Sequence, residues 1–189
     1  NSDMASPSRI KAGSNYHNSR LAYVEARLNG FGPPVMLNAA GKVAEGPGAC
    51  IMIVRRGKLI TPPVTADILE SITRETVMEL AERELGLTVV ERDIDRSELY
   101  VCEEAFFCGS GAEVLPIASI DHYDIGGGKP GAITRQLQQI YFDVVRGKID
   151  ALEPGVRKTH RPGDPVAAGG TAQFQHARCL HRGRPTPLQ

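Results

Sequence analysis

Hydrophobic periodicity stops at Gly147, and this limit fixes how much of the chain can build a core. Residues 14–147 alternate short apolar segments with helical patterns, whereas residues 1–13 have no periodic pattern, as expected of a linker. Residues 148–189 are rich in Pro, Gly, Arg and His and cannot bury a core, so we expect a disordered tail. The sequence therefore predicts one domain over residues 14–147, with the linker leading from a missing N-terminal domain.

Glycines divide the central region into helices and strands. Helical spacing from Asn15 ends at Gly30, and a second helix that begins near residues 71–73 ends at Gly86. Apolar residues 50–54 and 59–61 flank an Arg-Arg-Gly-Lys turn, which is typical of an antiparallel hairpin. Further segments are expected as a short strand at 35–37, buried strands at 87–90, 105–108 and 114–120, and a last helix at 134–145. This mixture predicts an α+β domain.

Charge and hydropathy exclude several classes of partner. Lys and Arg number 22 against 22 Asp and Glu, so the formal net charge is +0 and no global field favours nucleic acid or an anionic membrane. No apolar run approaches the roughly 20 residues of a membrane helix, and the N-terminus lacks a signal-peptide pattern. The Arg-rich tail offers only Phe174 for base stacking, which favours disorder over nucleic-acid binding. We expect a cytoplasmic protein with small-molecule or protein partners.

Cysteine spacing indicates reduced thiols and no metal site. Four cysteines form no Cys-x-x-Cys pair: Cys50, Cys102, Cys108 and Cys179. The first three stand in apolar, strand-like surroundings, where a thiol behaves as a small core residue. Cys179 lies between His176 and His181, but this tail has no regular pattern to fix ligand geometry. We interpret that group as accidental.

Five segments carry polar or glycine-rich motifs in a fixed order: Lys11-Ala12-Gly13-Ser14-Asn15-Tyr16, Glu45-Gly46-Pro47-Gly48, Thr61-Pro62-Pro63, Ser71-Ile72-Thr73-Arg74-Glu75 and Cys108-Gly109-Ser110-Gly111-Ala112-Glu113. In order and spacing, residues 9–147 resemble the C-terminal cofactor-binding domain of branched-chain amino-acid aminotransferases, which are fold type IV pyridoxal-phosphate enzymes. The resemblance implies a mixed, largely antiparallel, barrel-like sheet with flanking helices.

The resemblance also implies a catalytic lysine with pyridoxal 5′-phosphate bound to it as a Schiff base. Lys11 takes this role, because its uncharged amine would be the nucleophile and would then move the substrate Cα proton as general base and acid. Glu45 corresponds to the carboxylate that keeps the pyridine nitrogen protonated, and Tyr16 to the phenol that binds the 3′-oxygen of the cofactor. From residue pattern alone, these three could equally be a surface lysine, a turn glutamate and a half-buried core tyrosine.

The start of the second helix resembles the phosphate site of the family. Unpaired backbone N–H groups at a helix N-terminus favour an anion, so Ile72 and Thr73 are predicted to bind the cofactor phosphate. Leu69 corresponds to the residue that packs on the ring face. Ordinary N-capping and core packing require the same residue types, so both interpretations of these residues stay open.

The turn after residues 105–108 resembles a second anion site. Its backbone N–H groups can form a nest, and the resemblance implies that Ser110 and Gly111 bind the substrate carboxylate, with Ser110 also serving the phosphate. A tight turn between strands would explain the glycines as well. Ser110 stands where threonine is usual in the family, which keeps the hydroxyl.

Two departures from the family pattern affect the expected site. Ala49-Cys50-Ile51-Met52 replaces a segment that commonly begins with asparagine, so hydrogen bonds in the Glu45 loop are lost, although Cys50 can fill the space. The small domain of the family, which supplies a phosphate-binding arginine, much of the side-chain pocket and part of the dimer interface, has no counterpart here. Apolar surface that would meet it is expected to be exposed.

The resemblance implies transamination of branched-chain L-amino acids with 2-oxoglutarate, incomplete without the N-terminal domain, by a protein that is a homodimer at full length. A D-amino-acid aminotransferase or an aminodeoxychorismate lyase of the same fold is the alternative enzyme, although Gly13-Ser14-Asn15-Tyr16 favours the branched-chain group. A non-catalytic fragment that binds cofactor or pairs with a subunit is the alternative of another class.

Overall fold

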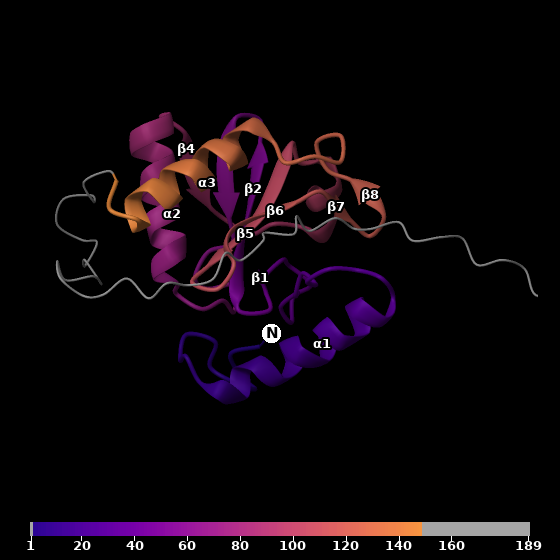
Figure 1. Cartoon of the computed structure of the whole chain (residues 1–189). Coiled ribbons are helices and arrows are strands. Elements are labelled where there is room, and N and C mark those ends of the chain that lie inside the picture. Colours follow the sequence, from indigo (N-terminus) through magenta and orange to yellow (C-terminus); the bar gives the residue numbers. More distant parts are fainter. Residues whose placement is uncertain (1, 149–189) are drawn as a thin grey trace, which may run out of the picture.

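A mixed sheet with two helices on one face forms the body of the protein (Figure 1). The structure is a computed structural model that describes residues 2–148. The six strands follow the order β4-β3-β2-β5-β6, with β1 paired to β2. They are β1 (Glu45–Gly46), β2 (Ala49–Arg55), β3 (Lys58–Thr61), β4 (Thr88–Glu91), β5 (Glu104–Gly109) and β6 (Glu113–Ile117).

Helices and a small second sheet complete the fold. The helices are η1 (Gly13–Asn15), α1 (Tyr16–Leu28), α2 (Ile72–Leu85), η2 (Arg96–Val101) and α3 (Ala132–Val145), and β7 (Ser119–Ile120) pairs with β8 (Tyr123–Asp124). The expected α+β class and the mixed, largely antiparallel sheet with flanking helices are confirmed. Over residues 2–148 the sheet is open rather than a closed barrel, because its path ends at β4 and β6.

The predicted hairpin is β2 and β3, which pair antiparallel around Arg56 and Gly57. Both turn residues have positive φ, 50° and 70°, as a tight hairpin turn of primed type requires. The chain then crosses through α2 and returns as β4, parallel to β3. The strand expected at 87–90 therefore forms, but at the sheet edge with exposed ends rather than as a buried strand.

Strands β2 and β5 are buried on both faces, which explains their nearly continuous apolar sequences. Alternate residues of β2 enter different cores, since successive side chains of a strand point to opposite faces. Cys50, Met52 and Val54 pack with α2 and α3, whereas Ile51 and Ile53 pack under η2 and the neighbouring loops. The central pair of strands thus fixes both cores at once.

Helix α1 has the predicted bounds but not a buried apolar face. In Figure 1 it lies apart from the sheet, and among its described residues only Ser19 is buried. Leu21, Val24 and Leu28 are 73%, 57% and 83% exposed. Helical spacing of apolar residues therefore predicted the helix correctly, although these three apolar side chains are largely exposed.

Other sequence predictions have mixed outcomes. Residues 35–37 form a single bridge, Leu37 to Val43, instead of a strand, and the strand expected at 114–120 is divided into β6 and β7 at Ala118. Cys50, Cys102 and Cys108 are free and buried, as predicted. The expected tail, with Phe174 and the His176, Cys179 and His181 group, lies outside the described residues.

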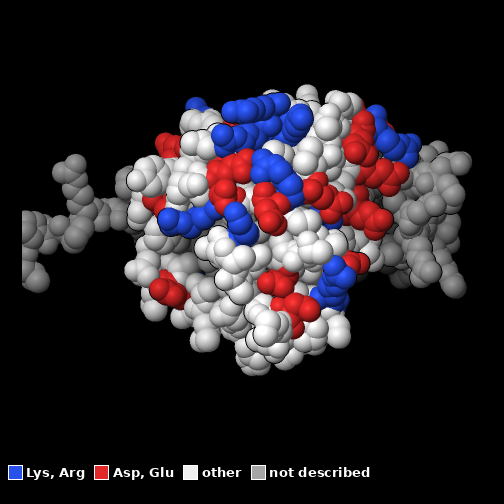
Figure 2. All heavy atoms as spheres, turned by 180° about the vertical axis from the view of Figure 1, so that it is seen from behind, with Lys and Arg blue, Asp and Glu red and all other residues white. Residues whose placement is uncertain are grey.

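Over the described range, no three His, Cys, Asp or Glu side chains are grouped as metal ligands would be. None of the helices in residues 2–148 has the length and apolar content needed to cross a membrane. Figure 2 shows acidic and basic side chains interspersed over one face of the molecule, in line with the balanced charge of the sequence.

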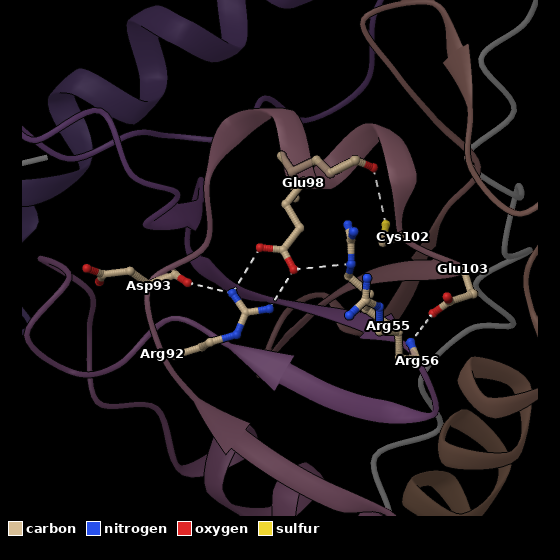
Figure 3. A network of polar contacts seen from close by, with 8 residues as sticks. Arg55, Arg56, Arg92, Asp93, Glu98, Cys102 and Glu103 are labelled. Carbon is tan, nitrogen blue, oxygen red and sulfur yellow. Dashed lines mark hydrogen bonds and ion pairs between the residues drawn. The ribbon is translucent and has the colours of Figure 1, made fainter.

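Glu98 of η2 is the centre of a polar network (Figure 3). Its carboxylate accepts hydrogen bonds of 2.9 and 2.5 Å from Arg92 and lies 3.6 Å from the Arg55 guanidinium. Arg92 follows β4 and Arg55 ends β2, so one carboxylate ties η2 to both segments. The hydrogen bonds from Arg92 hold the pKa of Glu98 below its ordinary value of 4.5.

We predict that Glu98 makes the protein acid-sensitive. Because its folded pKa is lower than the unfolded value, the stabilisation is present above pH 4.5 and is lost as pH falls through the folded pKa. Urea unfolding at several values between about pH 6 and pH 3 should show a smaller loss of stability in Glu98→Gln than in the parent. Glu82→Gln, on the exposed side of α2, should keep the parental slope. An equal dependence of the free energy of unfolding on pH in the parent and in Glu98→Gln would contradict the role of Glu98 in acid sensitivity.

Glu104 caps helix α3, and its removal should destabilise the fold. The carboxylate accepts hydrogen bonds from Ile133 N at 3.0 Å, Thr134 N at 2.7 Å and Thr134 Oγ1 at 2.6 Å. Glu104→Ala should lower the free energy of unfolding by about 2 kcal/mol, because these donors lose a charged acceptor. Chemical denaturation measures this change. Glu103→Ala, which removes a single contact to Arg56 N, should cost clearly less, and an equal cost would refute the capping role.

Candidate functional site

A cavity of about 590 Å³ is lined by the N-terminal segment, the start of α1, and residues at the ends of β1, β2 and β5. It gathers six of the predicted site residues into its lining: Lys11, Tyr16, Glu45, Leu69, Ser110 and Gly111. An amine, a phenol, a carboxylate and a glycine-rich turn thus face one volume, although they are up to 100 residues apart in sequence. The predicted residues Ile72 and Thr73 lie beside this lining rather than in it.

Glu45 belongs to strand β1, is half-buried, and lines the cavity. One carboxylate oxygen, Oε2, accepts a hydrogen bond of 3.1 Å from Leu69 N, which links two predicted site residues directly. The next residue must be glycine, because a Cβ on Gly46 would lie 2.5 Å from Cε1 of Phe107. Close packing of Gly46 against the Phe107 ring therefore fixes the backbone next to Glu45.

Polar contacts hold the segment that carries Lys11. The Asn15 side chain donates to Pro7 O and Ile10 O, each at 2.8 Å, and so closes the chain around Lys11. Arg9 pairs with Glu70 at 3.3 Å, next to Leu69 in sequence. Lys11 itself is exposed and contributes to the lining of the cavity.

Tyr16 and the glycine turns form the narrow part of the cavity. A Cβ on Gly48 would lie 3.5 Å from Cε1 of Tyr16, so the phenol ring stands against the turn between β1 and β2. A Cβ on Gly109 would lie 3.1 Å from Gly48 O. Gly109 ends β5, and Ser110 and Gly111 follow it, exposed, in the cavity lining. Gly109 can approach the backbone of the other turn this closely because it has no side chain.

Helix α2 contributes to the cavity through its N-cap. Ser71 accepts a hydrogen bond of 3.4 Å from Arg74 N and lines the cavity, which sequence reasoning did not assign to it. Ile72 is 81% exposed, and Thr73 is buried. The roles predicted for the backbone N–H groups of Ile72 and Thr73 stay predictions.

Arg74 is a buried cation that fixes this helix end. Its guanidinium donates to Thr61 Oγ1 at 3.3 Å, to Pro62 O at 2.9 Å and to Glu91 at 2.6 Å. These acceptors belong to β3, the segment after it, and β4. A buried arginine needs such partners, since an unpaired buried charge is strongly destabilising. An arginine in the first turn of a helix is too common a sequence pattern to predict that Arg74 links α2 to β3 and β4.

Cys50 is a further lining residue without a predicted polar role. Burial raises the pKa of its thiol to about 11, with a further contribution from the charge of Glu45. Its sulfur donates to Leu69 O at 3.6 Å. Sequence reasoning treated Cys50 only as a small space-filling group, because a cysteine in an apolar strand gives no local signal of its partner.

Comparison with known proteins identifies the family of this chain. The sequence model of the amino-transferase class IV family matches residues 1–120. A probable branched-chain-amino-acid aminotransferase from Aquifex aeolicus is 49% identical over 149 residues, which cover 79% of this chain and 48% of that protein. A branched-chain-amino-acid aminotransferase from Pseudomonas aeruginosa is 46% identical over 146 residues, 77% of this chain and 47% of that protein.

Solved structures show the same relationship in three dimensions. The branched-chain amino acid aminotransferase of Thermobaculum terrenum in its PLP form has 54% identity and a TM-score of 0.77, over 79% of this chain and 48% of that one. The chain therefore spans about half the length of the relatives it matches. The family resemblance seen in the sequence is confirmed: this chain belongs to the amino-transferase class IV family.

Proposed function

We propose that this chain is the cofactor-binding part of a pyridoxal-phosphate-dependent aminotransferase that moves amino groups between branched-chain L-amino acids and 2-oxoglutarate. The observation that carries the proposal is the cavity in which Lys11, Tyr16 and Glu45 meet. The names of related structures support the substrates: a 35% identical branched-chain amino acid aminotransferase has been solved with N-(5′-phosphopyridoxyl)-L-glutamate and with 4-methylvaleric acid. The first contains the amino form of 2-oxoglutarate, and the second has the carbon skeleton of leucine.

The residues present fit this cofactor. An aromatic cofactor needs backbone that can come close to its ring, and Gly48, beside the Tyr16 ring, and Gly109 line the cavity without side chains. A pyridinium needs a fixed carboxylate, and Glu45 is oriented by Leu69 N. An anionic phosphate needs N–H or hydroxyl donors, which the Gly109-Ser110-Gly111 turn and the α2 N-terminus offer.

When bound, pyridoxal phosphate supplies an aldehyde that links covalently to an amine and a ring that accepts electrons. Lys11 Nζ would make that link and then carry the proton to and from the substrate Cα. Glu45 would hold the proton of the ring nitrogen, and the Tyr16 hydroxyl would donate to the ring oxygen. Leu69 would pack on the ring face.

Anion binding is divided between two elements in this proposal. The N–H groups of Ile72 and Thr73 would hold the phosphate together with Ser110, and Ser110 with Gly111 would hold the substrate carboxylate. The remaining groups of a complete pocket, including a phosphate-binding arginine and most of the side-chain pocket, would come from a domain that precedes residues 1–13. We further propose a cytoplasmic homodimer for the complete protein, with residues 14–147 as its cofactor domain.

Borohydride reduction tests the role of Lys11. Protein mixed with pyridoxal phosphate and reduced should carry the cofactor mass on the peptide that contains Lys11, because reduction makes the imine link permanent. Peptide mass mapping measures this modification. Lys11→Ala should abolish it, and Lys42→Ala, which only removes a surface pair with Asp95, should not. Labelling spread over surface lysines, unchanged in Lys11→Ala, would overturn the proposal.

Amino donors separate the enzyme alternatives. L-leucine should shift the absorbance of the bound cofactor, whereas D-alanine should not, if branched-chain L-amino acids are the substrates. A response to D-alanine alone would favour a D-amino-acid aminotransferase of the same fold. Specific labelling of Lys11 with no response to any donor, even after the preceding domain is added as a separate chain, would favour the non-catalytic fragment.

A further inference from the structure

Cys50 connects strand β2 to the loop that carries Leu69. Its side chain is 3% exposed, and it reaches the cavity floor from the core. Because burial raises the pKa of the thiol to about 11, the sulfur keeps its proton at neutral pH and acts as a donor. The acceptor is Leu69 O, at 3.6 Å, a normal separation for the weak hydrogen bond of a thiol.

Leu69 is held from both sides by residues of the cavity. Its N–H donates to Glu45 Oε2 at 3.1 Å, and its carbonyl accepts from Cys50. Ser71, which caps helix α2, lies two residues after Leu69 and lines the same cavity. The Cys50 thiol and the Glu45 carboxylate therefore hold Leu69 from two sides just before the helix begins.

A second cysteine provides a natural comparison. Cys108 on β5 is the direct antiparallel partner of Cys50 and belongs to the same core cluster. It is equally buried, with 0% exposure, but it is not part of the cavity lining. The two thiols thus share volume, burial and sheet position, and differ in the contact with Leu69.

We propose that Cys50 is a positioning residue: its thiol anchors Leu69, so that the Leu69 side chain and the Glu45 carboxylate keep the places in which they meet the cofactor ring. The effect of this anchor on cofactor binding rests on the proposed function. The anchor itself is a property of the cofactor-free chain. It does not require Cys50 to touch the reacting atoms.

Substitution separates the anchor from simple space filling. Cys50→Ala removes the donor and one atom of volume, whereas Cys50→Ser keeps a donor on the same carbon. Cys108→Ala removes the same atom from the same core but leaves the contact with Leu69. A structural role alone predicts similar effects for the two alanine variants.

Amide hydrogen exchange measured by mass spectrometry tests the anchor without cofactor. The peptide covering residues 66–74 should exchange faster in Cys50→Ala than in the parent, because the Leu69 backbone loses one of its two hydrogen bonds to cavity residues. Cys50→Ser should restore slow exchange, and Cys108→Ala should leave it unchanged. Equal acceleration in both alanine variants would overturn the proposal, as would no acceleration in Cys50→Ala.

Titration with pyridoxal phosphate, followed by absorbance, tests the consequence for binding. Cys50→Ala should bind about fivefold more weakly than the parent, corresponding to ~1 kcal/mol, and Cys50→Ser should recover most of the loss. An unchanged affinity of Cys50→Ala for pyridoxal phosphate would show that the anchor does not contribute to cofactor binding. If the parent itself binds no cofactor, the proposed function fails, while the exchange experiment still decides whether Cys50 holds Leu69.

Discussion

Antiparallel pairing of β2 with β5 is the interaction on which the rest of the structure depends. Its register places Cys50 opposite Cys108, so the turn before β2 and the turn after β5 meet at one end of the sheet. Gly48 lies in the first turn and Gly109 directly before the second, and the two residues approach each other closely in the lining of the cavity. A shift of one residue would exchange the two faces of the strand, which are both buried, and would separate the turns. Core packing and site geometry are therefore fixed by the same register.

The crossover from β3 through α2 to β4 supplies the other wall. Arg74 lies where these elements meet, and its charge is satisfied by Thr61, Pro62 and Glu91 together. Because the buried guanidinium loses hydration, it is stable only while all three elements stay in place. That constraint holds the start of α2 and, through Ser71, the loop that contains Leu69. A charge outside the cavity thus determines the position of residues inside it.

Local patterns predicted much of this fold, since glycines with positive φ end α1 and α2 and form the β2–β3 turn. Periodicity identifies apolar residues but not the element that covers them. For this reason the sequence predicted a buried strand at 87–90, where the structure has an edge strand. The order and spacing of five motifs, rather than hydrophobic periodicity, placed Lys11 and Glu45 in one predicted site. Contacts such as Cys50 with Leu69 could not be predicted, because they depend on which loop folds over a strand.

The two sides of the site are held by forces of different strength. Glu45 extends from a strand pinned by the Phe107 ring, so its position is tied to the core. Lys11 belongs to a segment attached by exposed groups, among them the Arg9–Glu70 pair, and such surface pairs contribute only about 0–1 kcal/mol. The carboxylate is thus preorganised, while the amine depends on a weaker attachment that a bound ring or a neighbouring domain can reinforce. Order at Lys11, rather than at Glu45, limits how well this chain can form the site.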